Sequence, residues 1–187
     1  MTKRDKLINL KKKMLSVDLP LKRGATKLVF GEGSAEADLF FIGEGPGFWE
    51  DQKGRPFVGR AGALLTKCLD EIGVSRSQVF ITNVIHYRPP ANRDPLETEI
   101  NAFQPFLDEM IEIIKPKVII TLGRFSMAKF LSDAKISQVH GSKHVVNFNK
   151  QEVVVIPMYH PAAALRNGQV MREFLKDFNN IPKILKN

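Results

Sequence analysis

Short apolar runs alternate with longer amphipathic segments along most of this chain, and this alternation restricts its fold more than any other feature. The clearest apolar runs are DLFFIG, VFITNV, KVIITLG and EVVVIPMYH, at residues 38–43, 79–84, 117–123 and 152–160. Residues 60–73 and 97–114 lie between them and have the apolar spacing of helices. Strands that alternate with helices predict a parallel sheet covered by helices on both faces.

Further elements are expected on either side of these runs. Residues 4–15 carry apolar side chains at helical spacing among lysines, and residues 170–186 are typical of a closing helix. The runs KLVFGEG (27–33) and HVVNF (144–148) are rich in strand-forming residues, and residues 125–131 predict a short helix. We expect one domain over residues 1–187, in which residues 1–25 form a helical N-terminal extension.

The charge and the cysteine content restrict the class of protein. The net charge of +8 favours a polyanionic partner such as nucleic acid, although a lysine-rich solvated surface would give the same balance. The single cysteine, Cys68, excludes a disulfide framework or a four-cysteine metal site within one chain. One cysteine suits a reducing compartment. Since the sequence also has no apolar stretch of signal-peptide or membrane-span length, we expect a cytoplasmic protein.

Polar or glycine-rich segments follow the predicted strands. They read GEGPG, TNVIHYRPPANRDP, TLGR and MYHPAAALRN. In open parallel sheets, ligands bind beyond the carboxyl ends of the strands. We therefore expect at least three of these segments to face one cleft, with the glycine-rich residues 43–62 as one wall.

The glycine-rich segment does not have the pattern of a nucleotide site. GEGPG is not GxGxxG, no Walker-type GKS or GKT occurs, and Pro46 lacks the amide that a phosphate cradle would use. Glu44 and Glu50 instead place two carboxyl groups within a loop of glycine and proline, which favours a functional role over a solvated loop. With no HxxH, HExxH or Cys/His cluster in the sequence, we expect no catalytic metal.

Three further residues have both a structural and a functional interpretation. Phe57 in GRPFVG is either a core residue or a platform on which a base could stack. Asn83 ends a strand, where its amide either fixes the next loop or reads the polar edge of a pyrimidine. His160 opens HPAAALRN, with Pro161 suited to a first helical turn, and is either structural or a donor to a developing oxyanion.

Together these residues resemble the uracil-DNA glycosylase superfamily, and most closely its family 4, the iron–sulfur class. The matching segments are GEGPGFWEDQKGRPFVGRAG, ITNVIHYRPPANRDP, KPKVIITLGR and YHPAAALRN, which occur in family order within residues 31–167. The resemblance implies a three-layer α/β/α fold, for which we expect a central, mainly parallel four-stranded sheet. It also implies hydrolysis of the N-glycosidic bond of uracil in DNA, which leaves an abasic site.

The resemblance also implies roles for individual residues. Gly43 to Gly47 would be its first motif, and Glu44, Gly45 and Glu50 would line the base pocket. Phe57 would stack on a flipped uracil, Asn83 would read the uracil edge, and Asn92 would help to organise the pocket. His160 would hydrogen-bond uracil O2. We expect Glu50, and next Glu44, to orient water or stabilise the sugar cation. DNA contacts are expected from Arg88, Arg93, Leu165 and Arg166, with Leu165 or Arg166 as the wedge.

The chain departs from the family at the cluster ligands. Four cysteines hold a [4Fe–4S] cluster in this class, and Ser16, Leu19, Tyr87 and Phe103 stand at their positions. We therefore expect an enzyme without this cluster and without another cofactor. We also expect it to be a monomer and to act on uracil in single- or double-stranded DNA. Two other functions remain open at this point: a glycosylase for hypoxanthine or xanthine, and a catalytically silent nucleic-acid-binding module.

Overall fold

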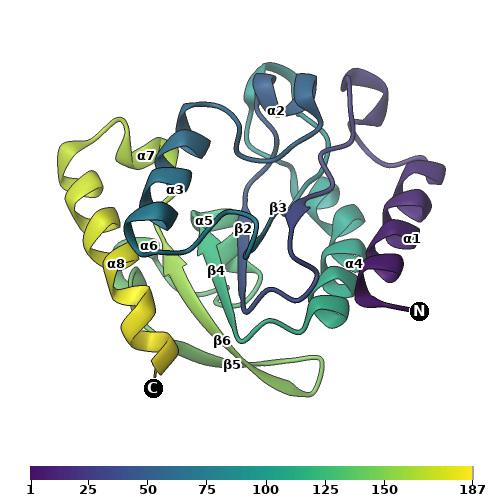
Figure 1. Cartoon of the computed structure of the whole chain (residues 1–187). Helices are drawn as coiled ribbons and strands as arrows, with labels where there is room; N and C mark the ends of the chain where they lie inside the picture. The colour runs from purple at the N-terminus through teal and green to yellow at the C-terminus, as the bar shows by residue number, and fades with distance from the viewer. Residues whose placement is uncertain (187) are drawn as a thin grey trace.

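The computed structural model describes residues 1–186, and in this range a six-stranded sheet lies between two layers of helices (Figure 1). The strand order is β1-β3-β2-β4-β6-β5. The strands span Glu32–Gly33 (β1), Leu39–Gly43 (β2), Phe80–Asn83 (β3), Val118–Leu122 (β4), His144–Phe148 (β5) and Gln151–Met158 (β6). The four central strands β3, β2, β4 and β6 are parallel, whereas β1 and β5 are antiparallel to their neighbours.

The three-layer, mainly parallel architecture is confirmed, but the expected number of four strands is wrong. A short antiparallel strand is added at each edge of the sheet. β1 pairs with β3 through two residues only, so most of the run 27–33 is not strand. β5 and β6 form a hairpin whose turn residues Asn149 and Lys150 both have positive φ, 47° and 66°. Positive φ at both turn positions is typical of the type I′ hairpin turn.

The helices agree largely with the apolar periodicity. They span Lys3–Ser16 (α1), Phe48–Lys53 (α2), Arg60–Glu71 (α3), Glu97–Ile114 (α4), Arg124–Ala128 (α5), Ile136–Val139 (α6), Pro161–Ala164 (α7) and Gly168–Lys186 (α8). Short 3₁₀ turns cover Lys22–Gly24 and Pro90–Asn92. The sequence did not predict α2 and α6. Pro161 begins α7, as a proline in a first helical turn indicates. None of the helices in residues 1–186 combines the length and apolarity that crossing a membrane requires.

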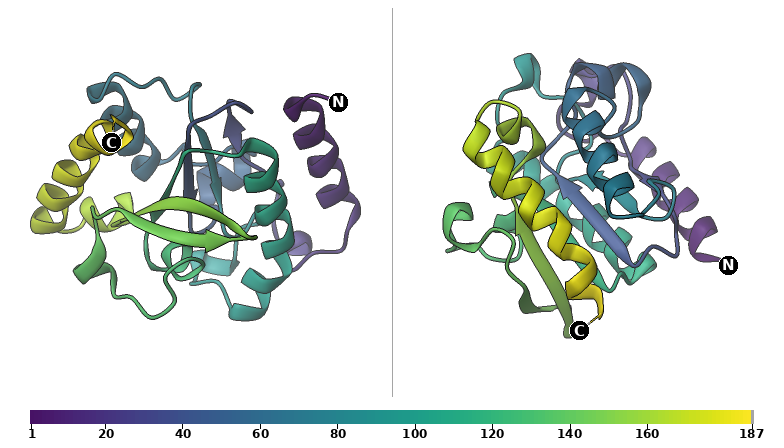
Figure 2. Two further views of the ribbon diagram at one scale, coloured as in Figure 1. Left: turned by 90° about the horizontal axis from the view of Figure 1, so that it is seen from below. Right: turned by 60° about the vertical axis from the view of Figure 1, so that its left-hand side comes forward.

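The two faces of the sheet carry separate apolar cores. Phe40 and Ile42 point to the face covered by α1 and α4, where Leu10, Met14 and Phe103 are also buried. Phe41 points to the opposite face, where α3 and α8 lie. Figure 2 shows the sheet between these two layers. Because side chains alternate along a strand, the apolar run of β2 serves both cores, which is why it has no polar alternation.

The carboxyl ends of the parallel strands lie at one edge of the sheet, above which α2 stands in Figure 1. Gly43 at the end of β2 is in register with Asn83 at the end of β3. The amide of Gly123, just after β4, donates to the carbonyl of Met158 at the end of β6 at 2.8 Å. These pairings bring the segments after four strands together.

Candidate active site

A cavity of about 220 Å³ lies at this edge of the sheet, and most of the predicted site residues line it. The predicted residues that line it are Glu44, Gly45, Glu50, Phe57, Asn83, Asn92, Arg93 and His160. Gly43 supports the wall, whereas Arg88, Leu165 and Arg166 lie outside the lining. The segments after β2, β3 and β6 therefore converge on one cavity, as the topology of a parallel sheet requires.

Phe57 is held against the cavity by two glycines. A Cβ atom on Gly43 would lie 2.5 Å from both the Phe57 ring and Asn83 Oδ1, so only glycine fits beneath them. Phe57 has a φ of 51°, an unfavourable backbone for a residue with a side chain. A Cβ on Gly62 would lie 1.8 Å from the Phe57 carbonyl oxygen. The sequence therefore uses two glycines and a strained residue to present one buried aromatic ring.

The Asn83 side chain is buried, with 1% of its surface exposed. Its Nδ2 atom has no hydrogen-bond partner among residues 1–186. Buried polar groups in folded proteins are nearly always paired, so a free amide donor at the wall of a cavity indicates a partner that enters from outside. A carbonyl oxygen is the group that such a donor would bind.

The imidazole of His160 has a defined hydrogen-bond pattern. His160 is the N-cap of α7, and its Nδ1 accepts a hydrogen bond from the backbone amide of Ala162 at 3.1 Å. Burial, reinforced by the positive charge of Arg166, lowers the pKa of His160 to about 4, so the ring is neutral at pH 7. A neutral ring that accepts at Nδ1 carries its proton on Nε2. His160 is therefore a donor, and its ring lies 5.7 Å from the Phe57 ring.

The two predicted carboxylates differ in their surroundings. Glu50 Oε1 accepts hydrogen bonds from the backbone amides of Val58 and Gly59, each at 2.9 Å, and so fixes the loop that carries Phe57. The Glu44 side chain makes no hydrogen bond within residues 1–186. Burial, with a smaller effect from Asp94, raises the pKa of Glu44. Glu44 therefore has the freer carboxyl group, whereas Glu50 is partly committed to structure.

The loop after β3 contains two arginines with internal partners. Arg93 makes a bidentate pair with the buried Glu99, at 2.9 and 2.6 Å. Glu99 also accepts from the amide of Leu96 and so begins α4. Arg88 Nε donates to Asn92 Oδ1 at 2.7 Å. Arg93 thus anchors the loop, and Arg88 holds Asn92 at the cavity.

The expected wedge lies in the turn after α7. Leu165 is the C-cap of this helix, and 38% of its surface is exposed. Arg166 is also exposed, and its side chain makes no hydrogen bond to any described residue. Both side chains therefore project from the same turn, close in sequence to His160.

Sequence reasoning missed several apolar residues of the cavity. They are Ala61, Ile85, Pro89, Pro95 and Ala162. Pro46 and Gly47 also line the cavity and belong to the predicted motif Gly43 to Gly47. A Cβ on Gly45 would lie 2.7 Å from Ile85, so this position leaves no room for a side chain. No single residue among these carries a chemical signal, but each follows a predicted strand end or borders a predicted site residue.

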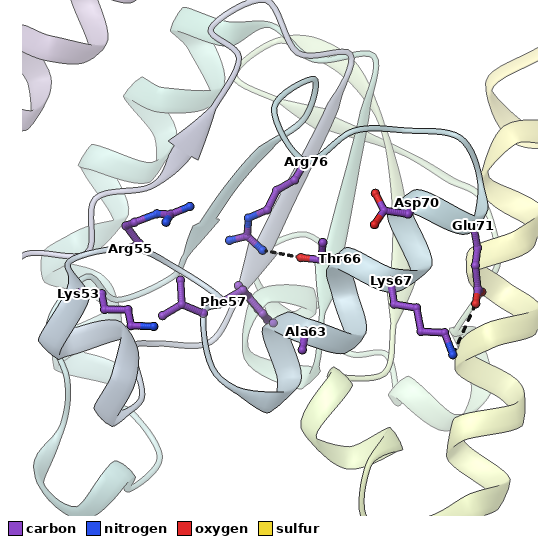
Figure 3. Close-up of a pocket in the computed structure, with 11 residues that line it drawn as sticks. Lys53, Arg55, Phe57, Ala63, Thr66, Lys67, Asp70, Glu71 and Arg76 are labelled. Atoms are coloured by element: carbon purple, nitrogen blue, oxygen red, sulfur yellow. Dashed lines mark hydrogen bonds and ion pairs between the residues drawn. The ribbon is translucent and has the colours of Figure 1, made fainter.

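Phe57 also lines a larger cavity, of about 850 Å³, whose other residues come mostly from α3 and the loops beside it (Figure 3). Its basic residues are largely paired: Arg76 and Arg55 both contact Glu32 at 2.6 Å, and Lys67 lies 3.8 Å from Glu71. Asp70 adds a negative charge to this open groove. We therefore place the chemistry in the smaller cavity, where unpaired polar groups converge.

Comparison with known proteins agrees with this geometry. The model of the uracil DNA glycosylase superfamily matches residues 30–181. The chain belongs to the uracil-DNA glycosylase superfamily. It is 48% identical over 165 residues to the type-4 uracil-DNA glycosylase of Sulfurisphaera tokodaii, which covers 85% of this chain and 75% of the relative. The type-4 enzyme of Archaeoglobus fulgidus is 42% identical over 170 residues, or 88% and 85% of the two chains.

The similarity to type-5 members of the superfamily is weaker. A type-5 uracil-DNA glycosylase of Pyrobaculum aerophilum is 28% identical over 148 residues, which is 70% of this chain and 63% of that relative. The resemblance to the iron–sulfur class is therefore confirmed by both the superfamily match and the type-4 relatives.

The residues at the family's cluster positions do not fit an iron–sulfur cluster. Leu19, Tyr87 and Phe103 are buried in the apolar core on the α4 face of the sheet, and Ser16 is an exposed residue that donates to a carbonyl of α1. None of the four provides a thiolate, the ligand that such clusters require. Cys68 lies in the core on the opposite face. We therefore derive no step that involves a cluster.

His86 is buried beside Phe30 and Phe103, in the core on the α4 face of the sheet. Its burial leads us to expect that the protein loses stability in acid. Burial lowers the pKa of His86 to about 4, and its Nε2 has no partner among residues 1–186. An unfolded histidine titrates near 6.5, so the unfolded state binds more protons as the pH falls, and stability is lost from there toward pH 4. Between about pH 7.5 and about pH 4.5, we expect the free energy of unfolding to fall by on the order of 2 kcal/mol less in His86→Phe than in the wild type.

Urea unfolding of both proteins at the two pH values measures this difference. Burial also lowers the pKa of His160, so this residue contributes to the same loss of stability. Because His160 is present in both the wild type and the variant, its contribution cancels when the two are compared. An equal loss of stability in wild type and variant would contradict the assignment to His86.

Proposed function

We propose that this chain is a DNA repair glycosylase that hydrolyses the N-glycosidic bond of uracil in DNA and leaves an abasic site. The observation that carries the proposal is the convergence of Phe57, Asn83 and His160 on one small cavity. The curated relatives are named uracil-DNA glycosylases, which agrees with it. We further propose that the chain acts as a single domain and a monomer, in the cytoplasm, on uracil in single- or double-stranded DNA.

Uracil must leave the base stack before it can enter the cavity. Leu165 or Arg166, exposed in the turn after α7, would occupy the space that the flipped nucleotide leaves. Arg88 and Arg166 would contact the phosphates. Arg93 would not, because its guanidinium is paired with the Glu99 carboxylate. The net charge of +8 supports binding to the DNA backbone.

Recognition would use the amide and the aromatic ring. Asn83 Nδ2, which lacks a partner among the described residues, would donate to uracil O4, while Oδ1 would accept from N3–H. Cytosine offers the opposite pattern at these two positions and would be rejected. Phe57 would stack on the face of the base, and Gly43 lets that ring and the Asn83 amide approach each other.

The chemistry would rest on stabilising charge that appears as the bond breaks. The uracil becomes an anion, and the neutral His160 would donate its Nε2 proton as a hydrogen bond to O2, where this charge develops. The sugar acquires oxocarbenium character, by analogy with glycoside hydrolysis. Glu44 would stabilise that cation or orient the attacking water, because its carboxyl group is free of internal hydrogen bonds among residues 1–186. Glu50 would position the Phe57 loop.

This division of roles predicts different effects of two matched substitutions. Glu44→Gln should lower kcat about 100-fold, because it removes the charge beside the sugar. Glu50→Gln should stay within about threefold of wild type, since the remaining amide oxygen still accepts from Val58 and Gly59. Single-turnover kinetics on a uracil oligonucleotide measure both. The reverse order of effects would assign the catalytic charge to Glu50.

A panel of lesion oligonucleotides tests the proposed function. Single- and double-stranded DNA bearing one uracil, hypoxanthine or xanthine is incubated with the protein, and abasic sites are cleaved with alkali. We expect cleavage at uracil. Cleavage at hypoxanthine or xanthine instead would favour a different glycosylase, and tight binding without base release would favour a silent binding module.

A further inference from the structure

The short helix α2 exposes two aromatic side chains and buries an acidic one. Phe48 and Trp49 have 46% and 57% of their surface exposed, whereas Asp51 has 3%. Asp51 accepts hydrogen bonds from the backbone amides of Thr26 and Lys27, so the helix is fixed to the protein by its polar side. Adjacent exposed aromatic rings, which gain nothing from burial in the core, indicate a surface that contacts a partner.

The two rings are ordered by their neighbours. They meet edge to face, with centroids 5.1 Å apart and an angle of 79° between their planes. The Trp49 indole also packs on Gly59, where a Cβ would lie 3.8 Å from its Cδ1. Gly59 borders the loop that presents Phe57. The Phe48–Trp49 pair, called here the aromatic platform, is therefore attached to the same loop as the ring inside the cavity.

One basic side chain lies over each ring of the aromatic platform, and both rings stay partly exposed. The Arg88 guanidinium carbon lies 5.2 Å from the centroid of Phe48, and Lys53 Nζ lies 6.0 Å from that of Trp49. Arg88 also donates to Asn92, which lines the cavity. Aromatic rings interleaved with cations are the combination by which proteins bind single-stranded nucleic acid, since bases stack on the rings and the cations contact the phosphates.

The aromatic platform is continuous with the cavity. Gly47 is the N-cap of α2 and lines the cavity, and Glu50 of the same helix does so one turn later. A strand whose uracil has entered the cavity would therefore pass directly over α2. The cations above the rings favour a polyanionic strand over an apolar protein partner.

We propose that Phe48 and Trp49 stack on an unpaired base next to the flipped uracil nucleotide, while Arg88 and Lys53 contact the adjoining phosphates. This inference rests on the proposed function, because it needs the uracil strand to enter the cavity beside α2. It assigns to the chain a second base-binding site outside the catalytic cavity, and it favours substrates with single-stranded character around the uracil.

Trp49 is the single tryptophan of the chain, so its fluorescence reports on the aromatic platform alone. The probe is a single-stranded oligothymidylate without uracil, and its binding is followed independently by the anisotropy of a dye at its end. We expect saturable quenching of Trp49 emission that parallels the anisotropy change. Bound oligonucleotide without any change in emission would overturn the proposal and leave a protein as the occupant of this surface.

Substitution gives the matching energetic test. The double variant Phe48→Ala/Trp49→Ala should bind the oligothymidylate about 5- to 150-fold more weakly, and Trp49→Phe should keep most of the affinity. For single-stranded uracil DNA the double variant should raise KM with little change in kcat. Val145→Ala, which alters a 58% exposed side chain on the edge strand β5, is the control and should change neither quantity.

The outcomes separate this inference from the proposed function. If the wild type releases uracil and the double variant binds the oligothymidylate as tightly as the wild type, the aromatic platform does not bind bases. The proposed glycosylase function would then still stand. Quenching and weakened binding without any uracil release by the wild type would support the aromatic platform as a nucleic-acid site and refute the proposed function.

Discussion

Asn83→Asp should lower kcat/KM for uracil excision by roughly 10²–10⁴-fold, which corresponds to about 3–5 kcal/mol for an unpaired charge in a buried site. The carboxylate would face uracil O4 with a like partial charge and would lose the donor that Asn83 Nδ2 provides. The geometry of β3 and Gly43 leaves this side chain no alternative position away from the cavity, because Asn83 is almost fully buried. Single-turnover release of uracil measures the effect.

Two controls separate recognition from loss of structure. Asn101→Asp makes the same chemical change at an exposed position of α4 and should leave activity unchanged. The Asn83→Asp protein should still bind DNA that contains an abasic analogue, since that ligand has no base to recognise. Retained uracil excision at close to the wild-type rate would contradict the role of Asn83.

Phe103→Ala should destabilise the protein by about 3–5 kcal/mol, the range found when a buried phenylalanine is truncated. Phe103 has no exposed surface and contacts the rings of His86 and Tyr87, at centroid distances of 5.6 and 6.2 Å. Phe103 and Tyr87 stand at two positions that hold cluster ligands in the iron–sulfur class. We infer that their packing stabilises this part of the core in place of a cluster. Urea unfolding measures the free energy of unfolding.

The control for Phe103 is the same substitution at an exposed site. Phe48→Ala should destabilise the protein by only about 1 kcal/mol, because 46% of this residue is already exposed and its ring loses little more than the contacts with Trp49 and Arg88. Iron and sulfide analysis of the untagged protein completes the test, and treatment with a chelator should leave the urea midpoint unchanged. Stoichiometric iron, or unfolding by the chelator, would show that apolar packing is not what stabilises this region.

The sequence predicted the central fold well because its signals are periodic. The predicted helix 97–114 coincides with α4, and the apolar runs at the centre of the sheet became β2, β3, β4 and β6. The run 144–148 was also predicted as a strand and became the edge strand β5, whereas the opposite edge was less predictable. β1 consists of two residues. Only its hydrogen-bonded pairing with β3 shows that most of the predicted run 27–33 is not strand. Pairing at an edge depends on tertiary contacts that a short run does not encode.

The sequence predicted which residues line the site better than it predicted the partners of their side chains. Strand ends brought Asn83 and His160 to one cavity, as a parallel sheet requires. The commitment of Glu50 to two backbone amides and of Arg93 to Glu99 depends on loop geometry and has no sequence signal. Helix α2 was missed because its aromatic side chains face outward and its acidic residue faces inward, the reverse of an amphipathic helix.

A crystal structure of the protein with its product, free uracil, tests the central claim most directly. We predict a uracil ring lying flat on Phe57, with its O4 and N3 edge within hydrogen-bond distance of the Asn83 amide and its O2 facing Nε2 of His160. Uracil bound elsewhere, for example in the larger cavity that Phe57 also lines, or bound with this edge turned away from Asn83, would contradict the account.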